Sequence, residues 1–254
     1  MPAVESIDIV RAKGRYFSDF GWLKTYWLFS FAHYYDPHNI QFGALRVFND
    51  DVVAPGKGFP THPHKEMEII TIVLAGEMTH QDSMGNKTVI RTGDVQRMSA
   101  GTGLTHSEFN LADDPVHFYQ IWILPDSADL VPSYDQRTFM PDDWCNRLLP
   151  VASGQGLDDG VVTFNADATI YRGQLDAGNK YTFDNVAGRR VFLYLKNGEL
   201  HVDGLALHTG DQARVDTEKP LSLAAITDTD FILIDVPSCK GWGYNDRTLR
   251  GGSA

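Results

Sequence analysis

The sequence predicts an all-β protein that contains two copies of one β-unit. Short runs rich in Val, Ile, Phe and Tyr recur along the chain and are separated by Gly, Asp and Asn, which is the pattern of strands and turns. A weak internal repeat is the second observation. The stretches "LAGEMTH", "TGDVQRM" and "DPVHFYQIWILP" return later in the chain as "KNGELHV", "TGDQARV" and "DTDFILIDVP".

Alternating or wholly apolar character marks the clearest strands. They are expected at residues 68–75, 77–81, 87–91, 116–124, 190–195 and 231–236. The stretch "DSMGN", residues 82–86, lies between two of these and is typical of a hairpin loop. Residues 125–160 are rich in Pro, Asp, Ser and Gly and are expected to connect the two copies, with a helical turn near "DDWCNRLL". We place the domain boundary near residue 150, which gives domains of residues 1–150 and 151–254.

Composition and charge describe an ordinary globular chain and argue against several functions. The 254 residues are 43% hydrophobic and 22% charged, which suits one large domain or two small ones. The formal charge of −11 opposes binding to a phosphate backbone, so direct nucleic-acid binding is not expected. No apolar leader opens the chain and no apolar run approaches about 18 residues, so neither export nor a membrane span is expected. The expected location is the cytoplasm, or also the nucleus if the protein is eukaryotic.

The stretch "FPTHPHKEMEIITIVLAGE", residues 59–77, contains the first candidate metal ligands. His62 and His64 are two residues apart, so on an extended strand both imidazoles project from one face. If the strand stays regular, the carboxylate of Glu68 shares that face. Pro63 confines this segment to a sheet edge or the start of a strand, because proline has no backbone N–H to donate to the hydrogen bonds of a β-sheet. Taken alone, this pattern is weak evidence for a metal site, because solvated histidines near the end of a strand are common.

A second cluster in "GDVQRMSAGTGLTHSEFN" strengthens the metal hypothesis. His106 and Glu108 are again two residues apart and follow a glycine-rich turn at Gly101 and Gly103. Three imidazoles and a carboxylate form a mixed nitrogen and oxygen set that suits non-heme Fe, with Mn, Ni, Cu or Zn as alternatives. The residues themselves do not choose the metal, nor whether Glu108 or Glu68 is the carboxylate ligand.

These residues resemble two motifs of the cupin superfamily. The pattern G-x5-H-x-H-x3-E-x7-G runs from Gly56 to Gly76, and G-x2-H-x3-N runs from Gly103 to Asn110. More narrowly, "HPHKEMEIITIVLAGEMTHQDSMGN", "TGDVQRMSAGTGLTHSEFN" and "SYDQRTF" are similar to the pirin family, whose bacterial members include quercetinase-like enzymes. The resemblance implies a bicupin, with two β-barrels of jelly-roll type and one metal in the N-terminal barrel. It implies the ligands His62, His64, His106 and Glu108, with Glu68 beside them.

The resemblance further implies a metal-dependent dioxygenase that opens the ring of a flavonol such as quercetin. Its partners are a small planar phenolic substrate and O₂, and a carboxylate, Glu108 or Glu68, takes the hydroxyl proton of the substrate. An apolar mouth is needed for a flat ring. The candidates by proximity to the motifs are Phe59, Met98 and Phe109. The departures from the usual pirin pattern, at residues 65–67, concern the rim of the site more than the metal.

Two other functions stay open on the sequence. A pirin of the regulatory kind is not an enzyme and engages transcription factors, so its partner is a protein. A different metal-cupin reaction, such as isomerisation of a small polar substrate, needs a polar or basic pocket instead of aromatic walls.

The second copy of the β-unit is expected to hold no metal. When the repeats are aligned at "GE" and "GD", the five candidate positions of the first copy correspond to Asp184, Val186, Arg190, Leu223 and Ala225. These do not form a ligand set, so one divalent metal per chain is expected.

The remaining histidines and the cysteines have plainer interpretations. His80 is interpreted as a hydrogen-bonded surface residue, and His117 is expected on the strand face opposite Gln120 and Trp122. The two cysteines are far apart in the sequence and are expected to be reduced thiols. They are Cys145 and Cys239.

Overall fold

The computed structural model describes residues 6–157 and 160–238 and is all-β, as predicted. The chain divides into two compact units. The N-terminal unit contains residues 16–138 and 164–166, and the C-terminal unit contains residues 6–15, 139–157, 160–163 and 167–238. Each unit contains one seven-stranded and one four-stranded sheet, which is the two-barrel arrangement expected of a bicupin. The strand of residues 6–10 belongs to the C-terminal unit, a pairing that the repeat pattern did not predict.

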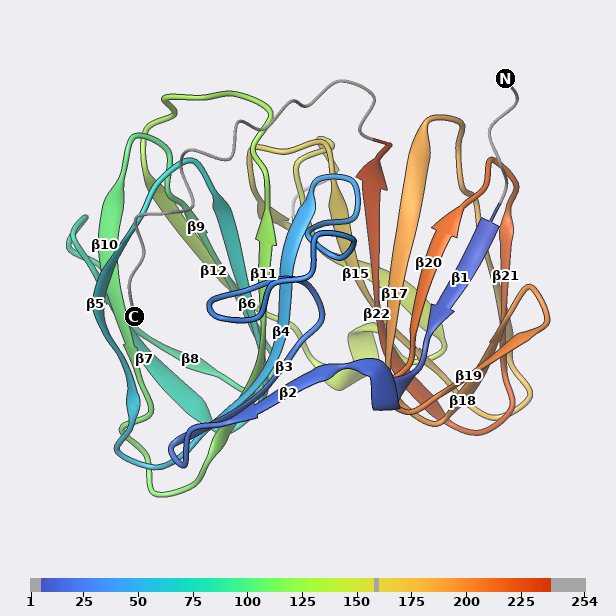
Figure 1. Ribbon diagram of the computed structural model, residues 1–254, viewed down its shortest axis with the longest axis horizontal. Helices are drawn as coiled ribbons and strands as arrows, with labels where there is room; N and C mark the ends of the chain where they lie inside the picture. Colours follow the sequence, from blue (N-terminus) through green and yellow to red (C-terminus); the bar gives the residue numbers. More distant parts are fainter. Residues whose placement is uncertain (1–5, 158–159, 239–254) are drawn as a thin grey trace. The chain divides into compact units, whose positions relative to one another are not determined.

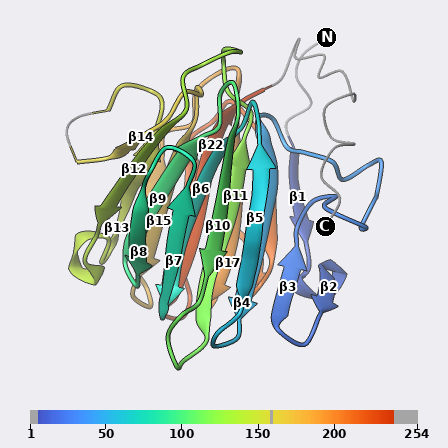
Figure 2. The same cartoon turned by 90° about the vertical axis from the view of Figure 1, so that its left-hand side faces the viewer.

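The N-terminal unit is built from two sheets (Figures 1 and 2). The first has the order β12-β9-β6-β11-β4-β3-β2, and the second has the order β5-β10-β7-β8. The strands are β2 (Tyr16–Asp19), β3 (Leu23–Trp27), β4 (Leu45–Val53), β5 (Gly58–His64), β6 (Glu68–Ala75), β7 (Glu77–Asp82), β8 (Lys87–Arg91), β9 (Asp94–Ser99), β10 (Leu104–Phe109), β11 (Val116–Ile123) and β12 (Ser133–Thr138). Figure 2 shows the four-stranded sheet turned toward the viewer.

The C-terminal unit repeats this plan. Its larger sheet has the order β1-β20-β17-β22-β15-β13-β14, and its smaller sheet has the order β16-β21-β18-β19. Its elements are β1 (Ser6–Val10), η1 (Ala12–Gly14), η2 (Pro141–Asp143), β13 (Arg147–Ser153), β14 (Val162–Thr163), β15 (Thr169–Leu175), β16 (Lys180–Phe183), β17 (Arg189–Asn197), β18 (Glu199–Val202), β19 (Leu205–His208), β20 (Gln212–Asp216), β21 (Leu221–Ala225) and β22 (Thr229–Pro237).

The strands expected from periodicity are present with shifts of one or two residues at their ends. The connector differs more from its prediction. The helical turn is a 3₁₀ turn at Pro141–Asp143, and the chain from Arg147 already forms β13, so most of "DDWCNRLL" is not helical. Pro141 favours this start because it needs no backbone donor in the first helical turn.

The strand β6 shows how the sequence positions the site. Its residues EIITIVLA are β-branched or apolar at most positions, and six of the eight are buried. The strand ends at Gly76, which has a φ of 77°. A Cβ at this position would lie 2.7 Å from the carbonyl oxygen of Pro115, so glycine is required there.

The two barrel interiors differ in chemistry. The interior of the C-terminal unit is an apolar cluster, whose largest members include Phe183, Leu193, Leu223 and Phe231. The N-terminal unit has a smaller apolar cluster around Val73, Met78 and Phe118, and polar side chains continue the interior beyond it. Apolar packing accounts for the stability of one barrel, whereas the other keeps buried polar groups that need a separate explanation.

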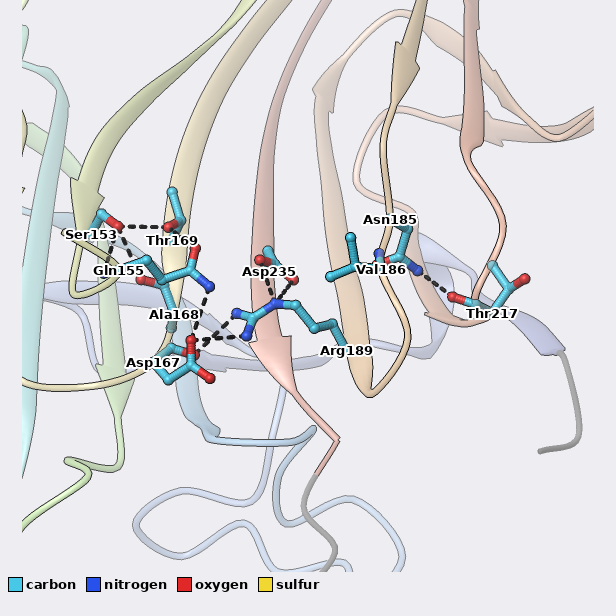
Figure 3. A network of polar contacts seen from close by, with 10 residues as sticks. All are labelled: Ser153, Gln155, Asp167, Ala168, Thr169, Asn185, Val186, Arg189, Thr217 and Asp235. Atoms are coloured by element: carbon cyan, nitrogen blue, oxygen red, sulfur yellow. Dashed lines mark hydrogen bonds and ion pairs between the residues drawn. The ribbon is translucent and has the colours of Figure 1, made fainter. Parts of the chain in front are cut away.

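The C-terminal unit has its own polar network near the end of β22 (Figure 3). Arg189 donates from Nε to both carboxylate oxygens of Asp235, at 2.8 and 2.7 Å, and from Nη1 to Asp167 at 2.8 Å. Gln155 donates to the same Asp167 carboxylate at 2.9 Å and accepts from Thr169 at 2.6 Å. The guanidinium therefore ties β17 to β22 and to the chain that precedes β15.

Within residues 6–157 and 160–238, no helix has the length and apolar character that crossing a membrane requires. Cys145 is a free, exposed thiol, and Cys239 lies outside the described residues.

Candidate metal centre

Three histidine rings meet inside the N-terminal unit, where β5 and β10 are neighbours. The antiparallel register places His106 opposite His62 and Leu104 opposite His64. The ring centroids are 4.4 Å apart for His62 and His106, 4.8 Å for His62 and His64, and 4.9 Å for His64 and His106. One ring nitrogen of each lies within 4.8 Å of those of the others. That spacing allows the three imidazoles to bind one ion.

Glu108 stands beside this group on the same face of β10 as His106. A bulge between the two residues shifts their pairing with β5, so that Glu108 lies opposite Phe59. The Glu108 carboxylate is 2% exposed and accepts one hydrogen bond of 3.2 Å from the amide of Gln120. Burial raises its pKa to about 7, and the Gln120 amide opposes that rise. Glu108 forms a second close group with His80 and His106, so His106 belongs to both groups.

Several buried atoms in these groups have no hydrogen-bond partner among the described residues. They are both ring nitrogens of His106, Nδ1 of His80 and Oε1 of Glu108. Buried polar groups without partners are rare in folded proteins and indicate an ion, a ligand or water. Nitrogen and carboxylate donors of this kind fit a divalent metal, and His62, His64, His106 and Glu108 are the residues placed to hold it.

His64 and His106 are also in the protonation state that a metal requires. Burial, followed by the neighbouring His62, lowers the pKa of His64 to about 3. Burial and the surrounding imidazoles lower the pKa of His106 to about 2. Both rings are therefore neutral near pH 7, and each offers a lone pair for coordination.

His80 is not a surface residue, so that interpretation of the sequence is wrong. Its side chain on β7 is fully buried, and its Nε2 lies 3.1 Å from the carboxylate of Asp82. Its ring centroid is 5.4 Å from that of His106 and 5.1 Å from that of Tyr134. The alternation of β7 puts residues 78, 80 and 82 inside the barrel, a signal that the sequence contained.

Glu68 does not share a face with the histidines, which corrects the expectation of a regular strand. The chain breaks between β5 and β6 at Glu66, whose φ is 51°, and its backbone amide donates to Gly101. Successive side chains of β6 point to alternate faces, so Glu68 and Thr71, three positions apart, lie on opposite faces. Thr71 lies on the cavity side, where its hydroxyl donates to Gln120. The Glu68 carboxylate accepts bonds from Ser99 at 2.6 Å and Asn165 at 3.2 Å. Burial raises its pKa, and both donors oppose the rise.

A cavity of about 80 Å³ lies beside the histidines, between the two sheets. It is lined by Leu23, Trp27, Phe31, Asn49, Asp51, Phe59, His62, His64, Glu108, Gln120 and Trp122. Of the three residues proposed for the mouth, Phe59 lines this cavity. Met98 is fully buried and is not among the lining residues, and Phe109 alternates to the face of β10 opposite Glu108.

Seven lining residues were not named as site candidates by sequence reasoning. Five of them lie on β3 and β4 or just after β3, and no motif marks them: Leu23, Trp27, Phe31, Asn49 and Asp51. The other two are Gln120 and Trp122 on β11. Gln120 and Trp122 could have been found, because the period of two places them together on the face opposite His117. His117 does lie on that other face, where its Nε2 is 2.6 Å from the carboxylate of Asp50.

The positions of the C-terminal unit that align with the candidate ligands of the first repeat do not form a similar cluster. Leu223 and Ala225 are part of its apolar core, and Val186 is exposed. Arg190 donates to Asp216 at 2.6 Å. Among the described residues, the groups with metal-binding spacing are both in the N-terminal unit. That the protein binds one metal stays a prediction.

Comparison with known proteins agrees with this architecture. A family model described as "Pirin" matches residues 10–123, and one described as "Quercetinase C-terminal cupin domain" matches residues 150–236. A protein of Escherichia coli strain K12 named quercetin 2,3-dioxygenase is 40% identical over 91% of this chain and 99% of its own. A pirin-like protein of Caulobacter vibrioides is 41% identical over 86% of this chain and 94% of its own.

Solved structures give the same result. The crystal structure of YhhW from Escherichia coli superposes with a TM-score of 0.87 at 40% identity, and covers 91% of this chain and 98% of that one. The structure of the bacterial pirin YhhW in complex with nickel(II) has a TM-score of 0.86 at 39% identity, and covers 91% of this chain and 99% of that one. Two cupin barrels, the histidine cluster on β5 and β10, and relatives that span nearly the whole chain lead to one conclusion. The chain belongs to the pirin family of the cupin superfamily.

Proposed function

We propose that this protein is a metal-dependent dioxygenase that opens the ring of a flavonol-type substrate, such as quercetin, with O₂. One divalent metal per chain, Fe, is held by His62, His64, His106 and Glu108. The observation that carries the proposal is the convergence of three imidazoles and a buried carboxylate, one of whose oxygens has no hydrogen-bond partner among the described residues, beside an aromatic cavity. Relatives named quercetin 2,3-dioxygenase, and a nickel complex of a relative, support the reaction class and a divalent ion.

The metal supplies the redox chemistry and a site for chelation, and the protein supplies binding and proton transfer. Trp27, Phe31, Phe59 and Trp122 provide flat apolar walls against which an aromatic ring can pack. Glu108 is placed to accept the proton of a substrate hydroxyl, because its carboxylate lines the cavity beside the histidines. Its second oxygen accepts a hydrogen bond from Gln120, which in turn accepts one from Thr71 at 3.0 Å. This chain of bonds holds the carboxylate in place.

The size of the cavity restricts how a substrate binds. About 80 Å³ is well below the roughly 300–1,000 Å³ typical of sites that enclose a drug-sized ligand. A three-ring flavonol therefore enters with its oxygen-bearing edge, and the rest of the molecule either stays outside or displaces an aromatic wall. A small planar enediol or catechol fits with less rearrangement, so it belongs in any substrate panel.

An oxygen-electrode assay tests the proposal. Protein loaded with Fe and checked for metal content should consume O₂ with quercetin and release carbon monoxide, whereas apo-protein and the His106→Ala variant should not. Ni-loaded and Mn-loaded samples show which ion supports turnover. Flat traces with every flavonol and catechol on fully Fe-loaded protein would contradict the proposal and favour the regulatory role, for which the next measurement is protein-partner capture.

A further inference from the structure

We propose that Asp51, with Thr25 and Asn49, forms a polar subsite on the cavity wall opposite the histidines, and that this subsite binds a neutral hydroxyl group of the substrate. The inference rests on the proposed function and deepens it, because it names a feature that the substrate must carry. Asp51 and Asn49 belong to β4 and Thr25 to β3, both in the seven-stranded sheet, whereas the histidines and Glu108 belong to the four-stranded sheet. A molecule in the cavity therefore lies between the two polar walls.

The subsite contains buried oxygen atoms that make no hydrogen bond of ordinary geometry in the described structure. Asp51, Thr25 and Asn49 are 4%, 1% and 3% exposed. Oδ1 of Asp51, Oγ1 of Thr25 and Oδ1 of Asn49 have no such partner among the described residues, although the Thr25 hydroxyl is close enough to Asp51 to favour its ionised form. Asp51 is paired with Thr25 across β3 and β4, and Trp27 is paired with Asn49, so all three side chains are on one face. Asp51 and Asn49 also line the cavity.

The charges around Asp51 select a neutral group. Among the described residues, the cavity lining contains two carboxyl groups, Asp51 and Glu108, and no lysine or arginine. Burial raises the pKa of Asp51 to about 8; the Thr25 hydroxyl opposes this rise, and the carboxylates of Asp50 and Glu108 add to it. On the Asp51 wall a substrate carboxylate or phosphate would meet repulsion, because the lining offers no lysine or arginine and the proposed divalent ion belongs to the opposite wall. A phenolic hydroxyl can donate to a carboxylate or accept from a carboxylic acid, so it bonds in either protonation state.

A binding titration on the Ni-loaded protein under anaerobic conditions tests the subsite without turnover. The probes are quercetin, which carries several ring hydroxyls, and 3-hydroxyflavone, which keeps the chelating pair and lacks the other hydroxyls. Catechol is the small probe. Wild-type protein should bind quercetin more tightly than 3-hydroxyflavone. Asp51→Leu should weaken quercetin binding about 10-fold, as expected for the loss of a buried hydrogen bond, and should change 3-hydroxyflavone binding little.

Matched variants separate the subsite from a general loss of structure. Asp51→Asn keeps a hydrogen-bonding group and should retain most of the affinity, and Thr25→Val removes a hydroxyl with little change of shape and should lower quercetin affinity. Asp50→Asn is the control, because Asp50 lies on the other face of β4 beside His117. Metal content, measured by elemental analysis, should be equal in all variants.

The outcomes distinguish this inference from the proposed function. Selective loss of quercetin binding in Asp51→Leu together with flat O₂ traces in wild-type protein supports the subsite and contradicts the dioxygenase. Equal loss for all probes, or no loss for any, overturns the subsite and means that the three oxygen atoms bind only water. Failure of the wild-type protein to bind quercetin, 3-hydroxyflavone and catechol overturns it as well.

Discussion

Glu68 and Ser99 are joined by a hydrogen bond of 2.6 Å on the face of β6 and β9 that points away from Thr71 and the cavity. Glu108, in contrast, has one oxygen bonded to Gln120 and one with no partner among the described residues. Two glutamates that the sequence presents as alternatives are thus in different environments. One is already satisfied by protein donors, and the other is free to bind an ion.

The first prediction follows from this difference. Glu108→Gln should lower metal affinity more than Glu68→Gln, because only the former removes a carboxylate from the histidine cluster. Loss of a supporting residue typically costs about 10- to 100-fold in metal affinity, and loss of a ligand should cost more. Competition with a chelator of known affinity measures both variants. A larger effect of Glu68→Gln would reverse the assignment of the ligand.

The second prediction concerns the histidines and stability. His62→Ala or His106→Ala should abolish tight metal binding, and EDTA should lower the melting temperature of wild-type protein but not that of these variants. A ligand present at about 1,000 times its Kd stabilises the folded state by about 4 kcal/mol. Calorimetry of metal-loaded and stripped samples gives the shift. His117→Ala is a suitable control, since His117 faces away from the cluster. A metal-dependent shift that persists in His106→Ala would contradict the site.

The third prediction is the metal stoichiometry. Elemental analysis of purified protein should find one tightly bound ion per chain, because the C-terminal interior is apolar where the N-terminal one holds histidines. Stoichiometry near two, kept after extensive dialysis, would show a second site and disprove the expectation drawn from the repeat.

The fourth prediction is a pH dependence of the stripped protein. Asp51 and Glu108 have pKa values raised to about 8 and about 7, so the folded state binds more protons than the unfolded state and their stabilisation is lost as the pH rises. His64 and His106, with lowered pKa values, act in the opposite sense below pH 6.5, the ordinary histidine value. The two effects therefore offset each other in mildly acidic solution.

Between pH 6.5 and pH 8 only the carboxyl effect remains, so the free energy of unfolding should fall. Each group contributes at most about 1.4 kcal/mol per pH unit. Urea denaturation at several pH values measures the slope, and Asp51→Asn should make it shallower. A free energy of unfolding that rises over this range in wild-type protein would mean that Asp51 is ionised in the folded state.

The fifth prediction concerns the C-terminal network in Figure 3. Arg189→Ala should destabilise the protein by about 3 kcal/mol, because it leaves the buried Asp235 carboxylate without its partner. The matched control is Asp167→Asn, whose side chain is 49% exposed and whose loss should cost less than about 1 kcal/mol. Denaturant titrations compare the two variants, and metal content should not change in either. Equal effects would show that burial of the Asp235 pair does not govern its contribution.

The sequence alone determined the fold class and the histidine pairs. The period of two in an extended chain is a local property, so it correctly placed His62 with His64, His106 with Glu108, and Gln120 with Trp122. The internal repeat also predicted two copies of one β-unit, since each copy carries the same order of strands and turns, and the resemblance to the pirin family implied that each is a barrel.

Only the tertiary structure decided which strands face one another and where the local period is interrupted. The positive φ of Glu66 ends β5 and turns Glu68 to the other face, which a pattern of residue types does not show. The pairing of β5 with β10 brings His62 to His106, and the opposing sheet adds Asp51 and Trp27 to the cavity. These are contacts between residues far apart in the sequence. They depend on how the sheets pack, and no short stretch of the chain encodes them.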